Sequence, residues 1–510
     1  MANQNTPSVP EQEQDSNTLR QIRLEKLRQR QADGNDPFTI TKYDVTAKAA
    51  SVKADYEVTE AKFKEEAGDD EEALQAKLDT LKEQPISIAG RIMSWRDMGR
   101  ANFIDVRDST DRIQVYVRMN DIGKENFKEF KKWDIGDIVG VKGFVFRTRK
   151  GEISIHATEI TMLSKSLLPL PEKWHGLKDQ DTRYRQRYLD LIVNPNVKQT
   201  FVTRSQILRE IRAYLDGIGY LEVETPVLLP LQIAAAAKPF VTHHNTLDID
   251  MKLRISNELF LKRLIVGGLD RVYEMGKMFR NEGMDRNHNP EFTSMECYAA
   301  YGDMELVIEV TEQVVYKAAM AVNGSPIIKY QGKEFDVTPP WKRIDMTDFV
   351  CEVTGIDFHN IADDETARAE AIKYGMDKNE VKNWTRGKII AEMFEEYCED
   401  LPGVLDGPVP VFVTGHPVEI SPLAKRSEAD PRITRRFEGY INGWEICNGF
   451  SELNDPIDQY ERFAEQQAQL DAGLDEEAHP MDMDFVNALE VGLPPTGGLG
   501  IGIDRVIMLI

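Results

Sequence analysis

The spacing of hydrophobic and polar positions changes along this chain and divides it into regions. A polar start rich in glutamine and asparagine (1–18) predicts disorder, and residues 19–84 carry helix-compatible patterns. From 85 to 165, short alternating runs are separated by turn-forming residues, which predicts a small β-barrel. A connector at 166–198 leads into 199–510, where helical and strand patterns are mixed. The predicted fold class is therefore α+β.

Charged and aromatic side chains gather in one stretch of the last region, FRNEGMDRNHNPEFTSMECYAAY. Alternation puts Phe292, Glu296 and Tyr298 on one face of a predicted strand. Arg280 and Glu282 share a face in the same way, and the turn-forming residues between the two sets predict a long hairpin connection. Such a surface suits an anionic, aromatic and partly cationic ligand set, and ATP with an amino acid fits that description. A solvated charge pair beside core aromatics is the competing interpretation.

A second predicted hairpin brings two glutamates together. The pair Asn442–Gly443, between two strand-like runs, is a strong signal for a two-residue turn, which would pair Tyr440 with Glu445. Glu438 would then pair with Cys447 and lie diagonally across from Glu445, about 7–8 Å away. Like charges that face one another destabilise a fold, and we see no cation beside them in the sequence, so we expect a metal ion there. Oxygen ligands near phosphates favour Mg²⁺, whereas an exposed acidic edge is the alternative.

The carboxyl-terminal run GGLGIGIDRVIMLI places Arg505 after a glycine-rich strand. Together with the FRNEG stretch, it resembles the second and third signature motifs of class II aminoacyl-tRNA synthetases. Glu258 and Glu452 narrow the resemblance to lysyl-tRNA synthetases of the bacterial type, over nearly the whole chain from about Leu19. The helical pattern that starts at Arg204 resembles motif 1, which builds the dimer interface in this class, so we expect a homodimer.

The resemblance implies a domain order and a set of site residues. An OB-fold anticodon-binding barrel (85–165) would precede a class II catalytic domain (199–510), an antiparallel sheet flanked by helices with a helical insertion at about 340–404. For ATP it implies Arg280, Glu282, His288, Asn289, Phe292 and Arg505, with Arg280 and Arg505 as the catalytic pair. For lysine it implies Ala234, Glu258, Glu296, Tyr298, Asn448, Phe450, Glu452 and Gly500. Glu438 and Glu445 would bind Mg²⁺, and Arg96, Phe103, Gln114 and Glu152 would read the anticodon of tRNA(Lys).

The charge of the expected lysine pocket supports this narrower assignment. Two partly desolvated carboxylates, Glu258 and Glu452, destabilise a site unless a cation fills it, and the ammonium of lysine supplies that charge. Aspartyl and asparaginyl synthetases share the architecture, but an aspartate pocket needs a positive lining. Asn448 and Phe450 can line the same cavity as Glu445 only if the strand is irregular near 446–448, so we predict a bulge there.

Composition constrains the partners and the compartment. At 510 residues the chain should hold more than one domain. Its net charge of −23 disfavours a nucleic-acid partner unless basic residues cluster, as they do in LRQIRLEKLRQRQ, which resembles the family's tRNA-binding amino-terminal helix.

The 4 cysteines show no CxxC spacing, which argues against disulfides and zinc and for a reducing cytoplasm. No apolar run reaches the roughly 20 residues that cross a bilayer, so no membrane partner is expected.

The chain departs from the family pattern in three places, and the altered loop and the end of the sequence motivate an alternative. The segment LQIAAAAKPF has Ile233 and Ala234 where the family usually has glycines, and Asn257 stands in place of a proline. The sequence also ends at Ile510, where the family continues through a final helix, and we expect this to expose an apolar VIMLI strand. The alternative is a catalytically impaired paralogue that binds tRNA or the adenylate.

Overall fold

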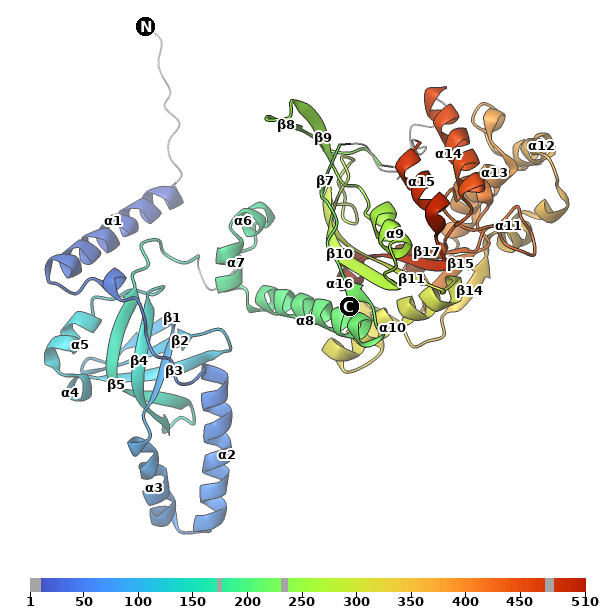
Figure 1. The fold of residues 1–510 in the computed structure, drawn as a ribbon. Coiled ribbons are helices and arrows are strands. Elements are labelled where there is room, and N and C mark those ends of the chain that lie inside the picture. The colour runs from blue at the N-terminus through green and yellow to red at the C-terminus, as the bar shows by residue number, and fades with distance from the viewer. Residues whose placement is uncertain (1–10, 172–176, 231–236, 473–480) are drawn as a thin grey trace, which may run out of the picture. The chain divides into compact units, whose positions relative to one another are not determined.

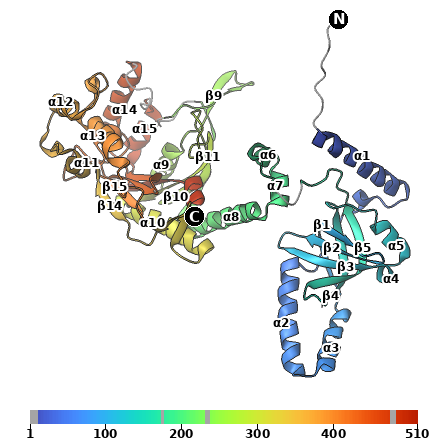
Figure 2. The same ribbon diagram turned by 180° about the vertical axis from the view of Figure 1, so that it is seen from behind.

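The computed structural model describes residues 11–171, 177–230, 237–472 and 481–510. The chain divides after Lys198 into two compact units, which Figures 1 and 2 draw from opposite sides. We describe each unit by itself.

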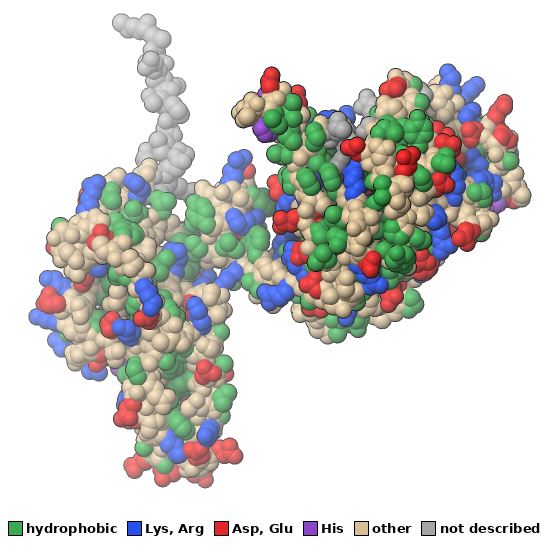
Figure 3. Space-filling view, viewed as in Figure 1, with side chains coloured by type: hydrophobic (Ala, Val, Ile, Leu, Met, Phe, Trp, Pro, Cys, Tyr) green, Lys and Arg blue, Asp and Glu red, His purple; other side chains and the backbone are tan. Residues whose placement is uncertain are grey.

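The first unit begins with helices. Its elements before the barrel are α1 (Glu11–Ala32), α2 (Ala49–Ala67) and α3 (Glu71–Asp79). Helix α1 starts before Leu19, the predicted start of helical structure. Helices α2 and α3 form a hairpin whose connecting turn is ringed by acidic side chains (Figure 3). Several basic side chains of α1 bind other parts of the same unit. Arg23 donates to the carbonyls of Ser166 and Leu168. Lys26 pairs with Asp134, and Arg30 pairs with Glu129.

A closed five-stranded barrel forms the centre of this unit, and the predicted OB fold is confirmed. Its strands are β1 (Ile86–Asp97), β2 (Ala101–Arg107), β3 (Arg112–Arg118), β4 (Ile138–Arg147) and β5 (Ile153–Ser164), in the order β1-β2-β3-β5-β4. Short helices α4 (Met119–Ile122) and α5 (Lys124–Phe130) connect β3 to β4. Side chains alternate between core and surface, so that Ile104, Val115 and Ile155 are buried while their strand neighbours face outward. After the barrel come α6 (Gln180–Arg185) and α7 (Arg187–Val193).

An eight-stranded sheet organises the second unit, and it is antiparallel except at its two ends. In spatial order the strands are β14 (Lys342–Asp345), β15 (Val411–Thr414), β16 (Arg436–Ile441), β17 (Trp444–Ser451), β18 (Thr496–Gly502), β11 (Glu291–Ala300), β10 (Arg271–Phe279) and β6 (Leu221–Glu222). Only the end pairs, β14 with β15 and β10 with β6, are parallel within the described sheet. The predicted α+β class is therefore confirmed.

Helices cover both faces of this sheet (Figure 1). One face packs against α8 (Pro195–Gly217), α10 (Met304–Asn323) and α16 (Ile503–Leu509), and the other against α9 (Glu258–Val266), α14 (Pro456–Asp471) and α15 (Met483–Gly492). Neighbouring residues of strand β11 point to opposite faces: Cys297 packs in the core with α8, α10 and α16, and Tyr298 in the core with α9, α14 and α15. The predicted VIMLI strand is wrong: this segment lies within α16, where Val506 and Leu509 are buried.

Smaller elements complete the second unit. The helical insertion contains α11 (Met346–Thr354), α12 (Asp364–Tyr374), α13 (Arg386–Phe394) and a π-helical turn (Glu395–Glu399) around a core of its own. A hairpin joins β12 (Ile327–Tyr330) to β13 (Lys333–Asp336), and β7 (Leu228–Leu229), β8 (Val241–His244) and β9 (Ile249–Leu253) form a three-stranded sheet. Short 3-10 turns lie at Pro37–Thr39, Thr80–Glu83, Phe358–Asn360, Val381–Asn383 and Val418–Ile420. In the described ranges we find no helix with the length and apolar character to span a bilayer.

Candidate active site

Two rows of side chains cross the central strands on the face that carries α9. The first row runs through the register partners Glu296, Gly500, Asn448 and Glu438. The second runs through Tyr298, Gly498, Phe450 and Arg436. Because β18 contributes glycine to both rows, the middle of the floor is left without side chains, and polar and aromatic groups stand on either side.

The glycine of the second row is required by close packing. A Cβ built on Gly498 would lie 1.8 Å from Oε1 of Glu452 and 2.6 Å from a ring carbon of Tyr298, distances that no real side chain adopts. At Gly500 the nearest atoms would be 3.7 Å away, an ordinary contact. The absence of a side chain at Gly498 therefore lets Glu452 and Tyr298 pack directly against this strand.

Above this floor lies a cavity of about 910 Å³ that gathers most of the residues predicted from the sequence. The predicted residues that line it are Glu258, Arg280, Glu282, His288, Asn289, Phe292, Glu296, Tyr298, Glu445, Asn448, Phe450, Gly500 and Arg505. Glu438 and Glu452 do not line it. Ala234, and Ile233 beside it, lie outside the described residues.

The hairpin that carries the two expected metal ligands has an irregular register. Asn442 and Gly443 have φ values of 56° and 71°, as a tight two-residue turn requires, and Tyr440 pairs with Glu445 as predicted. The register then shifts, so Glu438 faces Asn448, and the predicted pairing of Glu438 with Cys447 is wrong. The extra residue is Ile446, and the predicted irregularity is confirmed. Because of it, Glu445 and Asn448 line the same cavity.

The two glutamates of this hairpin are not free of cations, contrary to our expectation. Arg436, two residues before Glu438, pairs with it at 2.5 Å, and the Tyr440 hydroxyl donates to its other oxygen at 2.7 Å. Burial acts to raise the pKa of Glu438, but Arg436, His416 and Tyr440 outweigh it and the net shift is downward. Burial and the charge of Glu438 raise the pKa of Glu445, and its nearest arginine atom, Nη1 of Arg505, is 3.5 Å away.

The end of the cavity beside the connection that follows β10 holds both arginines expected to be catalytic. Arg280 and Glu282 lie just beyond β10, in the connection and not on a strand as expected, and the Arg280 amide bonds to the Pro290 carbonyl at 2.9 Å. The Arg280 guanidinium lies 5.4 Å from the ring centre of Phe292. Arg505 also reaches the His288 ring nitrogen at 3.1 Å, so the loop histidine does belong to this cluster.

At the opposite end, Glu296 is buried and held by two hydroxyl groups. Ser256 donates to one carboxylate oxygen at 3.1 Å and Tyr298 to the other at 3.0 Å. Burial and the charge of Glu258 raise the pKa of Glu296 to about 7. Asn257, which replaces a proline of the family pattern, is itself buried and donates to Glu274 at 2.8 Å, so the departure has a structural role.

Glu258 and Glu452 are bridged by a lysine of the chain itself, which sequence reasoning missed. The Lys262 Nζ lies 2.5 Å from a Glu258 oxygen and also pairs with Glu452. The expectation that both carboxylates await a guest cation is therefore corrected. The signal was present, because a lysine four residues after a glutamate on a helix reaches back to it. One oxygen of Glu452, Oε1 beside Gly498, has no hydrogen-bond partner among the described residues although the side chain is 1% exposed.

Comparison with known proteins identifies the family. The profile described as "tRNA synthetases class II (D, K and N)" matches residues 179–510, and the profile "OB-fold nucleic acid binding domain" matches 86–163. A lysine–tRNA ligase of Thermoanaerobacter pseudethanolicus is 51% identical over 97% of this chain and 93% of its own length. Lysine–tRNA ligases of Clostridium botulinum and Clostridium tetani are 48% and 49% identical, each over 98% of this chain and 94% of their own length. The chain belongs to the class II lysine–tRNA ligase family.

In this member of the family, the outer face of the barrel carries a cluster of rings. Phe103 is half-buried, not plain core, and its ring centre lies 4.9 Å from that of Tyr116. The cluster continues through Phe146, His156 and Phe144, which sequence reasoning did not single out. Alternation in β3, β4 and β5 was the available signal, because these positions all fall on the outward face.

The other residues expected at the anticodon lie around these rings. Arg96 is exposed and is the register partner of Phe103 across β1 and β2. Gln114 accepts a hydrogen bond from Ser154 at 3.0 Å, and Glu152 is exposed at the start of β5. The barrel therefore brings Arg96, Phe103 and Gln114 to adjacent positions of one sheet surface.

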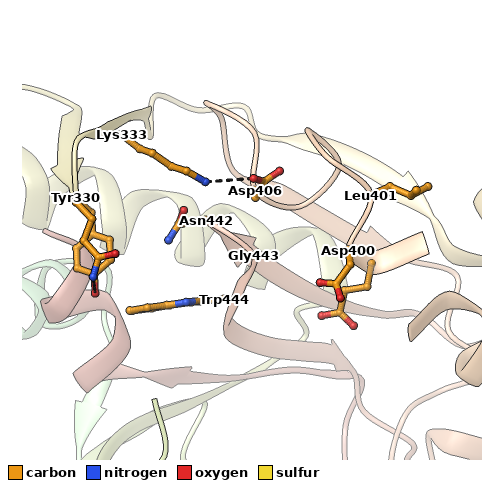
Figure 4. A pocket seen from close by; sticks show the side chains of 10 residues that line it. Tyr330, Lys333, Asp400, Leu401, Asp406, Asn442, Gly443 and Trp444 are labelled. Atoms are coloured by element: carbon orange, nitrogen blue, oxygen red, sulfur yellow. Dashed lines mark hydrogen bonds and ion pairs between the residues drawn. The ribbon is translucent and has the colours of Figure 1, made fainter. Parts of the chain in front are cut away.

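A second hollow, of about 470 Å³, lies at the turn of the β16–β17 hairpin (Figure 4). Its wall carries Trp444 and an ion pair between Lys333 and Asp406 at 3.1 Å. None of the residues predicted from the sequence as site residues lines it, and we assign it no role.

The packing at Gly498 gives a first prediction. Gly498→Ala forces Glu452 or Tyr298 to move, so we expect a loss of about 1–3 kcal/mol in the free energy of unfolding, measured by urea denaturation. Gly502→Ala is the matched control on the same strand, since its added carbon meets nothing closer than 3.6 Å. Equal stability of the two variants would contradict the close approach described above.

Proposed function

We propose that this protein activates L-lysine with ATP and transfers the lysyl group to tRNA(Lys). The observation that carries the proposal is the polarity of one cavity. Carboxylates gather at one end around Glu296 and Glu258, while Arg280, Phe292 and Arg505 stand at the other. An amino acid with a cationic side chain fits the first end and a nucleotide fits the second.

The charges at the acidic end fit lysine in particular. Three carboxylates, Glu258, Glu296 and Glu452, lie close enough to raise one another's pKa, and Lys262 pairs with Glu258 and Glu452. Lysine brings two ammonium groups, one on its α-carbon and one at the tip of its side chain, which would balance the remaining charge. The aliphatic part of the substrate would pack on Tyr298 and Phe450. An aspartate side chain would add a negative charge to the same cluster and is disfavoured.

The arginines at the other end would bind the phosphates of ATP. Arg280 would hold the α-phosphate through its planar guanidinium, and Arg505 the γ-phosphate. Because Arg280 covers Phe292 in this structure, an adenine ring can stack on Phe292 only once Arg280 has turned toward a phosphate. His288, Asn289 and Glu282 would contact the nucleotide from the loop.

Mg²⁺ is the ion that these residues fit. The described residues contain no cluster of three or more metal-binding side chains, so Glu438 and Glu445 alone would hold it from the protein side, with phosphates and water completing the shell. The raised pKa of Glu445, caused by burial and by Glu438, marks a carboxylate that a cation would stabilise. When bound, the ion neutralises charge on the phosphate oxygens.

The proposed reaction needs no nucleophile from the protein. The carboxylate of lysine attacks the α-phosphorus of ATP and pyrophosphate leaves, giving lysyl-adenylate. A hydroxyl of the terminal adenosine of the tRNA then takes the lysyl group and AMP leaves. Catalysis is positioning and charge stabilisation, and orientation alone can supply about 7–11 kcal/mol.

For the tRNA, the ring cluster and Arg96 offer a surface on which unpaired bases can stack. The net charge of −23 disfavours RNA binding by the chain as a whole, but stacking on a local surface of this kind does not depend on the net charge. We also propose a homodimer formed through α8, which exposes Phe201 and Val202, and a cytoplasmic location.

The central test is ATP–pyrophosphate exchange. Exchange should depend on lysine, and Arg280→Ala should lower it by more than about 100-fold because the α-phosphate loses its positioned charge, while dimerisation measured by gel filtration stays unchanged. Arg343→Ala is the matched control, since Arg343 forms a surface pair with Glu305. Absence of exchange with every amino acid would favour the impaired paralogue, and exchange with aspartate would refute the pocket assignment.

The recognition of lysine should depend on pH. Burial raises the pKa of Glu452 to about 8 and that of Glu296 to about 7, and protonation removes the negative charge that an ammonium needs. Binding is therefore complete above these values and is lost as pH falls through them. The KM for lysine in the exchange assay should rise several-fold from pH 8.5 to 6.5 (roughly tenfold per 1.4 kcal/mol lost), with a smaller change in the KM for ATP. A flat lysine profile would contradict this.

Mutations in the two units should affect different activities. Phe103→Ala removes one stacking platform, so we expect the kcat/KM for tRNA charging to fall by about 10-fold or more while lysine-dependent exchange stays within about twofold of the wild type. Phe38→Ala, an exposed phenylalanine outside the ring cluster, should change neither. An equal loss of both activities in Phe103→Ala would refute the anticodon assignment.

A further inference from the structure

Lys262 is the most completely buried cation among the described residues, with an exposed fraction of 0%. It stands on α9 one turn after Glu258, and its Nζ lies 2.5 Å from a Glu258 oxygen. The same Nζ pairs with Glu452, whose other oxygen lies beside Gly498 in the floor of the cavity. A buried ammonium strongly destabilises a fold unless it is paired, and here both partners are carboxylates of the expected lysine pocket.

Aromatic rings complete the surroundings of this ammonium. The ring centres of Phe450, Phe485 and Tyr298 lie 5.3, 5.6 and 6.0 Å from the Nζ. Tyr298 and Phe450 also line the cavity, so the same two rings face an internal cation on one side and the expected substrate on the other. Burial acts to lower the pKa of Lys262, but Glu258 and Glu452 more than offset it and the net shift is upward, so the group stays charged.

The two carboxylates keep acceptor capacity after binding Lys262. Oxygen Oε1 of Glu452, next to Gly498, has no hydrogen-bond partner among the described residues, and Glu258 itself lines the cavity. A carboxylate offers several lone pairs and can accept from two donors at once. Lys262 therefore occupies one side of the pair and leaves the other side for a second ammonium.

We propose that Lys262 is a positioning residue for lysine recognition: it holds Glu258 and Glu452 together as a preformed pair that receives the ammonium of the substrate side chain. This deepens the proposed function and rests on it. Lys262 makes no contact with the cavity itself, so it acts through the two glutamates. Without it, Glu452 would be a buried carboxylate facing Glu258 and Glu296 with no internal counter-charge.

The test is Lys262→Met, which keeps the length and removes the charge. In lysine-dependent exchange we expect the KM for lysine to rise at least about tenfold, as for the loss of a charge-assisted hydrogen bond, with the KM for ATP within about twofold of the wild type. Leu261→Ala is the matched control, because Leu261 is a buried apolar neighbour on α9 that carries no charge and does not line the cavity. It should lower stability and leave the KM for lysine unchanged.

The pH profile distinguishes positioning from packing. The groups that face Glu452 are Lys262, Glu258, Glu296 and the Tyr298 hydroxyl, and burial keeps the pKa of Tyr298 well above its usual value, so it stays neutral. Removing Lys262 leaves the pKa of Glu452 higher still. The pH at which lysine recognition is half lost should therefore move upward in Lys262→Met and stay in place in Leu261→Ala.

Two further measurements keep the proposal falsifiable if Lys262→Met does not fold. Lys262→Arg keeps the charge and Lys262→Gln does not, so the KM for lysine should be closer to the wild type in the former. In the wild-type protein with ¹⁵Nζ-labelled lysine, the Lys262 resonance should shift when unlabelled lysine is added, since the glutamates then serve two cations. A KM for lysine within about threefold of the wild type in both Gln and Met variants, an equal effect in Leu261→Ala, or an unmoved resonance would overturn the proposal.

A failure of this proposal is distinct from a failure of the proposed function. If the wild-type protein shows no lysine-dependent exchange, the function is wrong whatever Lys262 does. If the wild-type protein is active and the variants behave like Leu261→Ala, only the role of Lys262 is wrong.

Discussion

Buried negative charge is the constraint on which the active-site end of this fold depends. Glu296 and Glu452 are buried beside the central sheet and Glu438 is partly buried on β16, so water solvates these carboxylates poorly. Each carboxylate is stabilised differently: Glu296 by two hydroxyl groups, Glu438 by Arg436, and Glu452 by Lys262. Lys262 pairs with Glu258 and Glu452, and in the proposed function the ammonium groups of lysine balance the remaining negative charge at this end of the cavity.

The central sheet fixes the positions of these charged side chains relative to one another. Antiparallel pairing sets the residues of β11, β18, β17 and β16 in two rows, and glycines at the middle strand keep the floor open. The row with Glu296 and Glu438 is acidic at both ends, while the next row carries Tyr298, Phe450 and Arg436. Substrate atoms laid across the rows would therefore meet charge and aromatic surface in a fixed order.

The spacing of residues within single elements was enough to predict the barrel and the hairpin turn at Asn442–Gly443, whereas most of the cavity lining was implied by the resemblance to the synthetase family. It was not enough for the counter-charges. Arg436 and Lys262 stood close in sequence to the glutamates they pair with, but only the fold shows that Lys262 also reaches Glu452. The ring cluster beside Phe103 was missed for the same reason, since its members come from three strands. The VIMLI run was misread because a short apolar segment has no period that separates strand from helix.

One unpaired residue in β17, Ile446, has a wider consequence for how this family member can vary. Because Ile446 is an extra residue in the pairing, Asn448 and Phe450 face the same cavity as Glu445, whatever side chain stands at position 446. If the full-length strand paired without this irregularity, Ile446 would take the place opposite Gly439, and Cys447 and Gly449 would face the cavity in place of Asn448 and Phe450. Removing Ile446 itself would leave the observed pairs in regular alternation, so the strand tolerates a shorter segment at this one position while Asn448 and Phe450 keep their side of the sheet.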